Sequence, residues 1–174
     1  MKEISQKNLS QNSKARPEQS GWVFLLFLLI FDFFILCPFS FSQQTKVDSL
    51  LNILKTAKED TNKVNTLNIL GWELHLNKPD TSIILSNQAL QMSEKQKWEK
   101  GIAKSSVYLG VYNRLQGNYK QSLQHYSKAL EINKKMKDKK GISVSMGNIG
   151  NVYKDQSNYP QALDYYFKAM KLSE

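Results

Sequence analysis

A histidine-based metal site or catalytic site in this chain would have to use His75 and His125, which are its two histidines. They lie 50 residues apart, whereas a metal site or a histidine base needs a second ligand or partner within reach. The sequence contains no HExxH, CxxC or nucleophile-elbow pattern and no glycine-rich phosphate loop. We therefore expect no enzyme activity, no metal and no cofactor, and we interpret both histidines as exposed helix residues.

A cluster of lysines is the second feature that could bind a ligand. Its members, diluted by Asp138, are Lys134, Lys135, Lys137, Lys139 and Lys140, in a chain of formal net charge +9. One interpretation is a site for an anionic partner such as a lipid or polysaccharide. The interpretation that we favour is a solvated helix end, where cations complement the helix dipole.

The histidines and lysines described above lie within a sequence repeat that has a period of 40 residues. Gly101 recurs as Gly141, and stepping back from Ala129 leads to Ala89 in a weaker first copy. The other matching pairs are Gly110 and Gly150, Tyr119 and Tyr159, Tyr126 and Tyr166, and Ala129 and Ala169. Self-similarity at this period is typical of stacked repeats, in which each unit packs against its neighbours.

The apolar spacing inside one copy predicts two helices joined by a polar turn. Steps of 4, 3 and 4 residues keep apolar side chains on one helical face. They connect Ile142, Met146, Ile149 and Tyr153 in the first helix, and Tyr159, Leu163, Tyr166 and Met170 in the second. In the preceding copy we expect the turn at Gly117 and a left-handed glycine cap at Gly141.

The pattern Leu-Gly-x-x-Tyr, then Gly-x-Tyr, Ala, aromatic and Ala-Leu resembles the tetratricopeptide repeat (TPR) signature. The resemblance covers residues 60–174; the second copy departs from it at Asn113 and Ser122, and the first departs further. It implies an all-α, TPR-like helical-hairpin solenoid with a right-handed superhelix. Because 40 residues exceed the usual 34, we expect a longer second helix. The signature positions expected to pack between helices are Gly71, Ala89, Gly110, Tyr119, Tyr126, Ala129, Gly150, Tyr153, Tyr159, Ala162, Tyr166 and Ala169.

We divide the chain at changes in this pattern. Residues 60–100, 101–140 and 141–174 form three repeats, and residues 43–59 form an amphipathic helix that caps the first. Thr61 or Asn62 can cap the next helix. Residues 1–20 are a basic, polar leader without a period, which we expect to be disordered.

Residues 21–42 are almost wholly apolar and have two interpretations. A signal peptide cleaved after Ser42 is favoured by the short apolar core and by Asp32 and Pro38. A retained membrane anchor is favoured by the long basic leader. Both place the repeats outside the cytoplasm, either periplasmic or secreted in the first case and membrane-anchored in the second. We therefore expect no nucleic-acid partner.

In the TPR family, the first helices of successive repeats line a concave groove. Carried over by phase, the candidate groove residues are Asn65, Asn68, Trp72, His75, Lys104, Val107, Val111, Arg114, Val144, Asn151 and Lys154. Tryptophan and arginine are common binding anchors, although Trp72 could instead fill the core. The carboxylate clamp of TPR co-chaperones is absent, because its positions hold Asn68, Trp72, Tyr108, Val144 and Asn148.

The leader, capping helix and 40-residue repeats resemble the front end of bacterial TPR-containing sensor kinases and signalling regulators. We expect a non-catalytic interaction or sensing module that binds a peptide or protein in its groove. The alternative is the N-terminal input fragment of a larger sensor histidine kinase or transcriptional regulator. On the last helix, Tyr165, Phe167 and Met170 cannot all face inward. We expect that surface to cause self-association or to be covered by further repeats.

Overall fold

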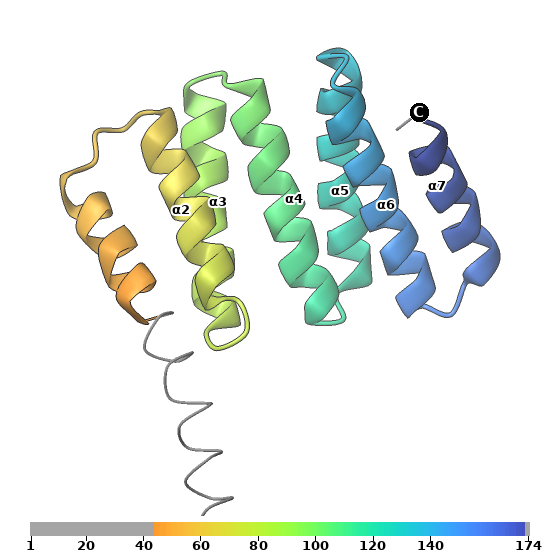
Figure 1. Cartoon of the computed structure of the whole chain (residues 1–174), viewed down its shortest axis with the longest axis horizontal. Helices are drawn as coiled ribbons and strands as arrows, with labels where there is room; N and C mark the ends of the chain where they lie inside the picture. Colours follow the sequence, from red (N-terminus) through yellow and green to blue (C-terminus); the bar gives the residue numbers. More distant parts are fainter. Residues whose placement is uncertain (1–43, 173–174) are drawn as a thin grey trace, which may run out of the picture. The chain divides into compact units, whose positions relative to one another are not determined.

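The computed structural model describes residues 44–172 (Figure 1). The expected leader, residues 1–20, and the expected signal or anchor segment, residues 21–42, lie outside the described residues. Among the residues that are described, no helix is long and apolar enough to cross a membrane. The chain separates into two compact units, and the second, Thr45–Glu174, contains the helices that follow.

The described residues form helices and no strands, as the repeat pattern predicts. A first helix at residues 44–56 precedes three helical hairpins (Figure 1). The hairpins pair α2 (Thr61–Leu74) with α3 (Pro79–Lys95), α4 (Glu99–Leu115) with α5 (Tyr119–Lys135), and α6 (Lys139–Asp155) with α7 (Tyr159–Lys171). Each helix packs against the next, so the expected all-α solenoid of three repeats is confirmed.

The spacing of the helices follows a half-period of 20 residues. Helices α3, α4, α5 and α6 each contain 17 residues, and three residues separate each from the next. Both helices of the central repeat are therefore equally long. A sequence period fixes only the sum of the two helix lengths, so the expectation that the second helix is longer than in a 34-residue repeat stays a prediction.

One type of turn ends four successive helices. Its central residue has a positive φ, at Lys97 (54°), Gly117 (77°), Lys137 (56°) and Ser157 (60°). In the second of these turns the Asn118 amide donates to the Asn113 carbonyl at 2.8 Å, and the Gly117 amide donates to Arg114 at 3.0 Å. The other three turns repeat both bonds, which define the Schellman motif.

The two predicted helix boundaries that differ from the structure are explained by aspartates. Gly141 is not a C-cap; it is the third residue of α6, and its amide donates to the Asp138 carboxylate at 3.0 Å. Lys137 takes the left-handed position instead. Asp60, rather than Thr61 or Asn62, caps α2 by accepting from two backbone amides. A carboxylate accepts such bonds well at the positive end of a helix.

Glycine and tyrosine pair across each of the last two hairpins. A Cβ added at Gly110 would lie 2.5 Å from the Tyr126 ring, and one added at Gly150 would lie 2.7 Å from the Tyr166 ring. Only glycine lets these helices approach so closely. Together with the burial of Ala169, this confirms the expected helix contacts at Gly150 and Ala169.

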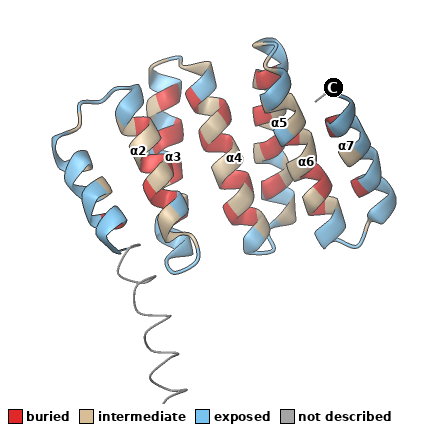
Figure 2. Ribbon diagram, viewed as in Figure 1, coloured by how far each residue is buried: buried red, intermediate tan, exposed pale blue. Residues whose placement is uncertain are grey.

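The signature positions as a set differ in burial (Figure 2). Those that are buried are Gly71, Ala89, Gly110, Tyr126, Ala129, Gly150, Ala162 and Ala169, and those that are half-buried are Tyr119, Tyr153 and Tyr166. Tyr159 is 61% exposed, so it does not pack between helices as expected. The first helix, residues 44–56, buries Val47 and packs Leu54 against the α2 core.

The last helix, α7, exposes a large apolar surface. Leu163, Phe167 and Met170 are 53%, 61% and 56% exposed, whereas Tyr165 stacks on Tyr153. The α5 positions equivalent to Leu163 and Met170 are half-buried where α6 packs on α5, whereas Ser127, the equivalent of Phe167, is exposed. The expectation that part of this surface is open to water is confirmed.

We predict that Lys137→Gly stabilises the protein, because a lysine with a φ of 56° carries a steric penalty that glycine lacks. The free energy of unfolding should rise by about 0.5–1 kcal/mol in urea titrations followed by circular dichroism. The matched change Gly117→Ala should lower it by about 1 kcal/mol. Gly117 has open space around its Cβ position, so a loss there would report backbone strain alone. Equal changes of one sign would contradict this account.

Candidate functional site

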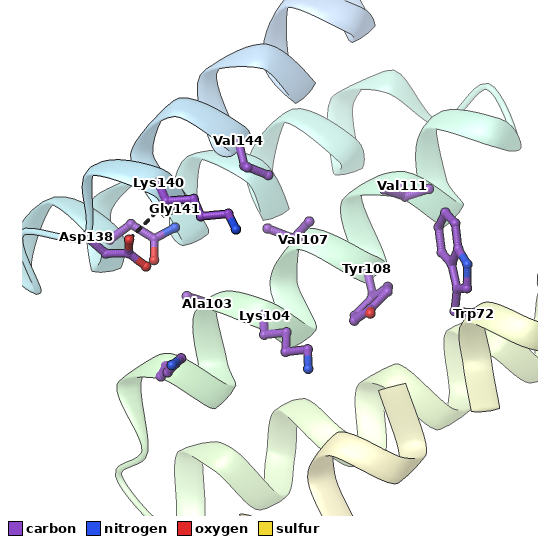
Figure 3. A pocket seen from close by; sticks show the side chains of 12 residues that line it. Trp72, Ala103, Lys104, Val107, Tyr108, Val111, Asp138, Lys140, Gly141 and Val144 are labelled. Atoms are coloured by element: carbon purple, nitrogen blue, oxygen red, sulfur yellow. Dashed lines mark hydrogen bonds between the residues drawn. The ribbon is translucent and has the colours of Figure 1, made fainter. Parts of the chain in front are cut away.

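The first helices of the three hairpins form one side of the repeat unit. Helix α2 contacts α4, and α4 contacts α6. A groove with a volume of about 760 Å³ lies across them (Figure 3). It is lined by Trp72, Lys100, Ala103, Lys104, Val107, Tyr108, Val111, Asn133, Asp138, Lys140, Gly141 and Val144.

The floor of the groove is apolar. Ala103, Val107 and Val111 repeat every four residues along α4, so their side chains follow one face of that helix. Val144 of α6 joins them and is 47% exposed. Ala103 is buried, so the apolar surface that a ligand can reach consists of the half-buried Val107 and Val111 together with Val144.

An aromatic stack forms one end of the groove. The ring of Trp72 lies 4.4 Å from that of His75 and 6.0 Å from that of Tyr108, and Tyr112 closes the set behind them. Trp72 is 44% exposed, so the alternative that it fills the core is wrong. Burial raises the pKa of Tyr108 above its ordinary value.

Lysines surround the other end. Lys100 and Lys104 come from the first two turns of α4, and Lys140 comes from the first turn of α6. Figure 3 labels Lys104 and Lys140. Lys104 donates to the Asn65 side chain at 3.0 Å. Among the described residues, Lys100 and Lys140 form no ion pair, and the nearby Asp138 carboxylate accepts from the Gly141 amide.

The structure divides the lysine cluster of residues 134–140 between two helices. Lys134 and Lys135 lie in the last turn of α5, where cations complement the dipole, and Lys135 pairs with Glu99. Lys139 and Lys140 lie instead in the first turn of α6, where the dipole disfavours cations. A solvated helix end therefore accounts for only the first part of the cluster.

The structure brings five of the predicted groove residues together. These are Trp72, Lys104, Val107, Val111 and Val144. Asn65 holds Lys104, and His75 supports Trp72 from behind, so these two act on the groove through a neighbour. His75 is half-buried rather than exposed as expected.

The other predicted groove residues do not line the groove. Asn68 is fully buried and donates to the Ser105 hydroxyl at 2.8 Å. Arg114 forms an ion pair with Asp155 at 2.5 Å. Asn151 accepts from the Tyr166 hydroxyl at 2.7 Å, and Lys154 is exposed outside the lining set.

Sequence reasoning missed Lys100, Tyr108 and Lys140 as groove residues. The repeat could have identified both lysines, because Lys140 lies 40 residues after Lys100 and both immediately precede the glycines that begin each copy. The sequence indicated Tyr108 only as a residue that replaces a member of the carboxylate clamp, and not as an aromatic side chain that a ligand could contact.

Outside the groove, His125 is half-buried on α5, and burial together with Lys128 lowers its pKa. It is therefore not the exposed residue that the sequence suggested. Within the described residues, no group of three or more histidine, cysteine, aspartate and glutamate side chains is placed to hold a metal ion.

The Arg114–Asp155 pair joins the last turn of α4 to the last residue of α6. Its side chains are only 22% and 25% exposed. We predict that Asp155→Asn, which leaves the guanidinium without a counter-charge, lowers the free energy of unfolding by on the order of 1–2 kcal/mol. Asp164→Asn is the control, since its pair with Lys168 is about half exposed, and it should change stability by less than about 0.5 kcal/mol. Urea titration measures both, and equal losses would refute a structural role for Arg114.

Comparison with known proteins finds a family whose sequence model matches part of this chain. Residues 101–174 match the sequence model of the family described as Tetratricopeptide repeat. A comparison with curated proteins finds no match.

Solved structures with the same fold include three proteins of low sequence identity. The TPR domain of Arabidopsis FLU has a TM-score of 0.58 and 22% identity, with 63% of this chain and 93% of that chain covered. BtubC from P. vanneervenii has a TM-score of 0.59 and 20% identity, and the match covers 66% of this chain and 48% of that chain. A Rap protein complexed with Competence and Sporulation Factor has a TM-score of 0.67 and 17% identity, and the match covers 77% of this chain and 40% of that chain.

This chain spans less than half the length of the BtubC and Rap chains. At these identities the structural similarity shows the fold alone. Residues 101–174, which form two of the three hairpins, are similar to the tetratricopeptide repeat family, and the solved structures show that the described chain has the same fold.

Proposed function

We propose that this protein is a non-catalytic interaction module whose groove binds an extended peptide or a segment of a partner protein. The observation that carries the proposal is the open apolar floor of Val107, Val111 and Val144, bordered by the exposed ring of Trp72. Apolar surface next to a few polar groups is typical of sites that bind ligands.

A solved relative supports a ligand-binding role for this fold. The Rap protein was crystallised in complex with Competence and Sporulation Factor. Its identity to this chain is 17%, so the comparison suggests a use of the fold and does not identify a ligand.

We predict that peptides selected from a random phage-displayed library will depend on the groove. Trp72→Ala and Val144→Asp should each weaken their binding at least about tenfold in fluorescence anisotropy titrations, which corresponds to about 1.4 kcal/mol. Both side chains are partly exposed, so the fold should tolerate these changes. Ile84→Asp, at a 57% exposed position on α3, is the control and should leave affinity unchanged. Full-strength binding to both groove variants would place the site elsewhere.

We also propose that α7 provides a second contact surface, through which copies of the chain associate. Phe167 and Met170 are more than half exposed on this helix. Burying such side chains between two copies would be favourable by about 25 cal/mol per Å² of apolar surface. Phe167→Ser should therefore reduce association in sedimentation velocity runs over a concentration series. Ile84→Ser should not, and an unchanged monomer at every concentration would reject this surface.

We further propose that the repeats act outside the cytoplasm, because the basic leader and the apolar segment at residues 21–42 resemble an export signal. Protein purified from its native host should begin at Gln43, which intact-mass measurement would show. A mass that includes residues 1–42 would support the membrane anchor instead. If the chain is the N-terminal input part of a larger sensor kinase or regulator, ligand binding in the groove would be the signal that it passes on.

A further inference from the structure

We propose that the groove selects an acidic segment and binds it in one register. Carboxylates lie against Lys100, Lys104 and Lys140, and an aromatic side chain stacks on Trp72. This inference rests on the proposed function, since it assumes that the groove binds a peptide.

Charge complementarity is the first argument. Three lysines line the groove against one carboxylate, Asp138, so the lining carries an excess of positive charge. Lys100 and Lys140 are exposed and form no ion pair with other described residues. A ligand with carboxylates would complement this uncompensated charge.

The position of the lysines in their helices is the second argument. Lys100 and Lys140 are each the second residue of a helix, α4 and α6 respectively. A cation there lies near the positive end of the helix dipole, which costs helix stability. The dipoles also add to the positive potential of the lysines. Helix stability therefore does not account for two lysines one repeat apart, whereas attraction of an anion does.

The aromatic end of the groove is pre-organised. Trp72 is held by stacking on His75 and by the tilted ring of Tyr108 at 6.0 Å, while 44% of its surface stays open. A ring fixed in this way loses little freedom when a ligand stacks on it. An aromatic side chain with its centre 4.5–7 Å away would gain a favourable ring contact.

The length of α4 sets the spacing between the two ends. Lys100 lies in the first turn of α4 and Tyr108 lies eight positions later on the same helix, and both line the groove. Eight residues rise about 12 Å in a helix. An extended peptide covers that distance with about four residues at roughly 3.3 Å each. The segment should thus place its acidic residues about four positions from its aromatic residue, with small or apolar side chains over Val107.

Matched synthetic probes test the inference. The reference probe is a fluorescein-labelled peptide with the order Glu-Asp-Ala-Val-Ser-Phe. A second probe has the same composition with Phe next to the acidic pair, and a third replaces both acidic residues by lysine. Fluorescence anisotropy with the purified protein at low ionic strength measures the affinity for each.

The reference probe should bind at least about fivefold more tightly than the reordered probe, and the basic probe should bind most weakly. The double variant Lys100→Glu/Lys140→Glu should weaken the reference probe at least about tenfold and should gain affinity for the basic probe. Lys120→Glu/Lys171→Glu is the control, since it changes net charge equally at exposed sites outside the groove lining. It should leave the preference unchanged.

Three outcomes would overturn the inference. If the lysine variants bind the reference probe at full strength while Trp72→Ala abolishes binding, the groove binds peptides but does not select acidic ones. If a single-stranded oligonucleotide displaces the probe and binds regardless of Trp72, the site is a general polyanion surface. If neither these probes nor any library-selected peptide binds, the proposed function fails together with the inference.

Discussion

The structure depends on the close approach of a tyrosine ring to a glycine backbone within a hairpin. Tyr126 lies over Gly110, and Tyr166 lies over Gly150, at distances that exclude any side chain on the glycine. This contact sets how closely the two helices of a repeat pack, because protein interiors cannot compress to accept an extra methyl group. Helix α4, which carries the floor of the groove, is thereby held against α5.

The regular spacing of helices α3 to α7, which begin every 20 residues, then aligns equivalent helix faces into a binding surface. Because a helix begins every 20 residues between α3 and α7, equivalent positions of α4 and α6 lie side by side. Lys100 and Lys140, one full period apart, consequently border the same groove. Among the described residues, Lys97, Lys137 and Ser157 are non-glycine residues with positive φ, so the chain maintains this spacing even where its turns are strained.

Much of the fold was predictable because it follows from short-range rules. The apolar spacing around Ile149 and Tyr153, the small residues Gly150 and Ala169, and the 40-residue period predicted three helical hairpins. The groove was predicted less well. Trp72 and Val144 do line it, but Asn68 is buried and Arg114 is engaged by Asp155. The phase of a repeat identifies the helix and its approximate face, not the partner that a side chain finds on another helix.

The sequence by itself determined the helical repeat, its register and its small-residue contacts, since these depend on spacing along one chain. Only the tertiary structure decided which side chains stay open to a ligand. Lys135 and Lys140 look alike in one basic run, yet Lys135 pairs with Glu99 of α4, whereas Lys140 borders the groove without a described ion-pair partner. The difference arises between residues far apart in the sequence, because charge pairing and burial depend on which helices meet in space.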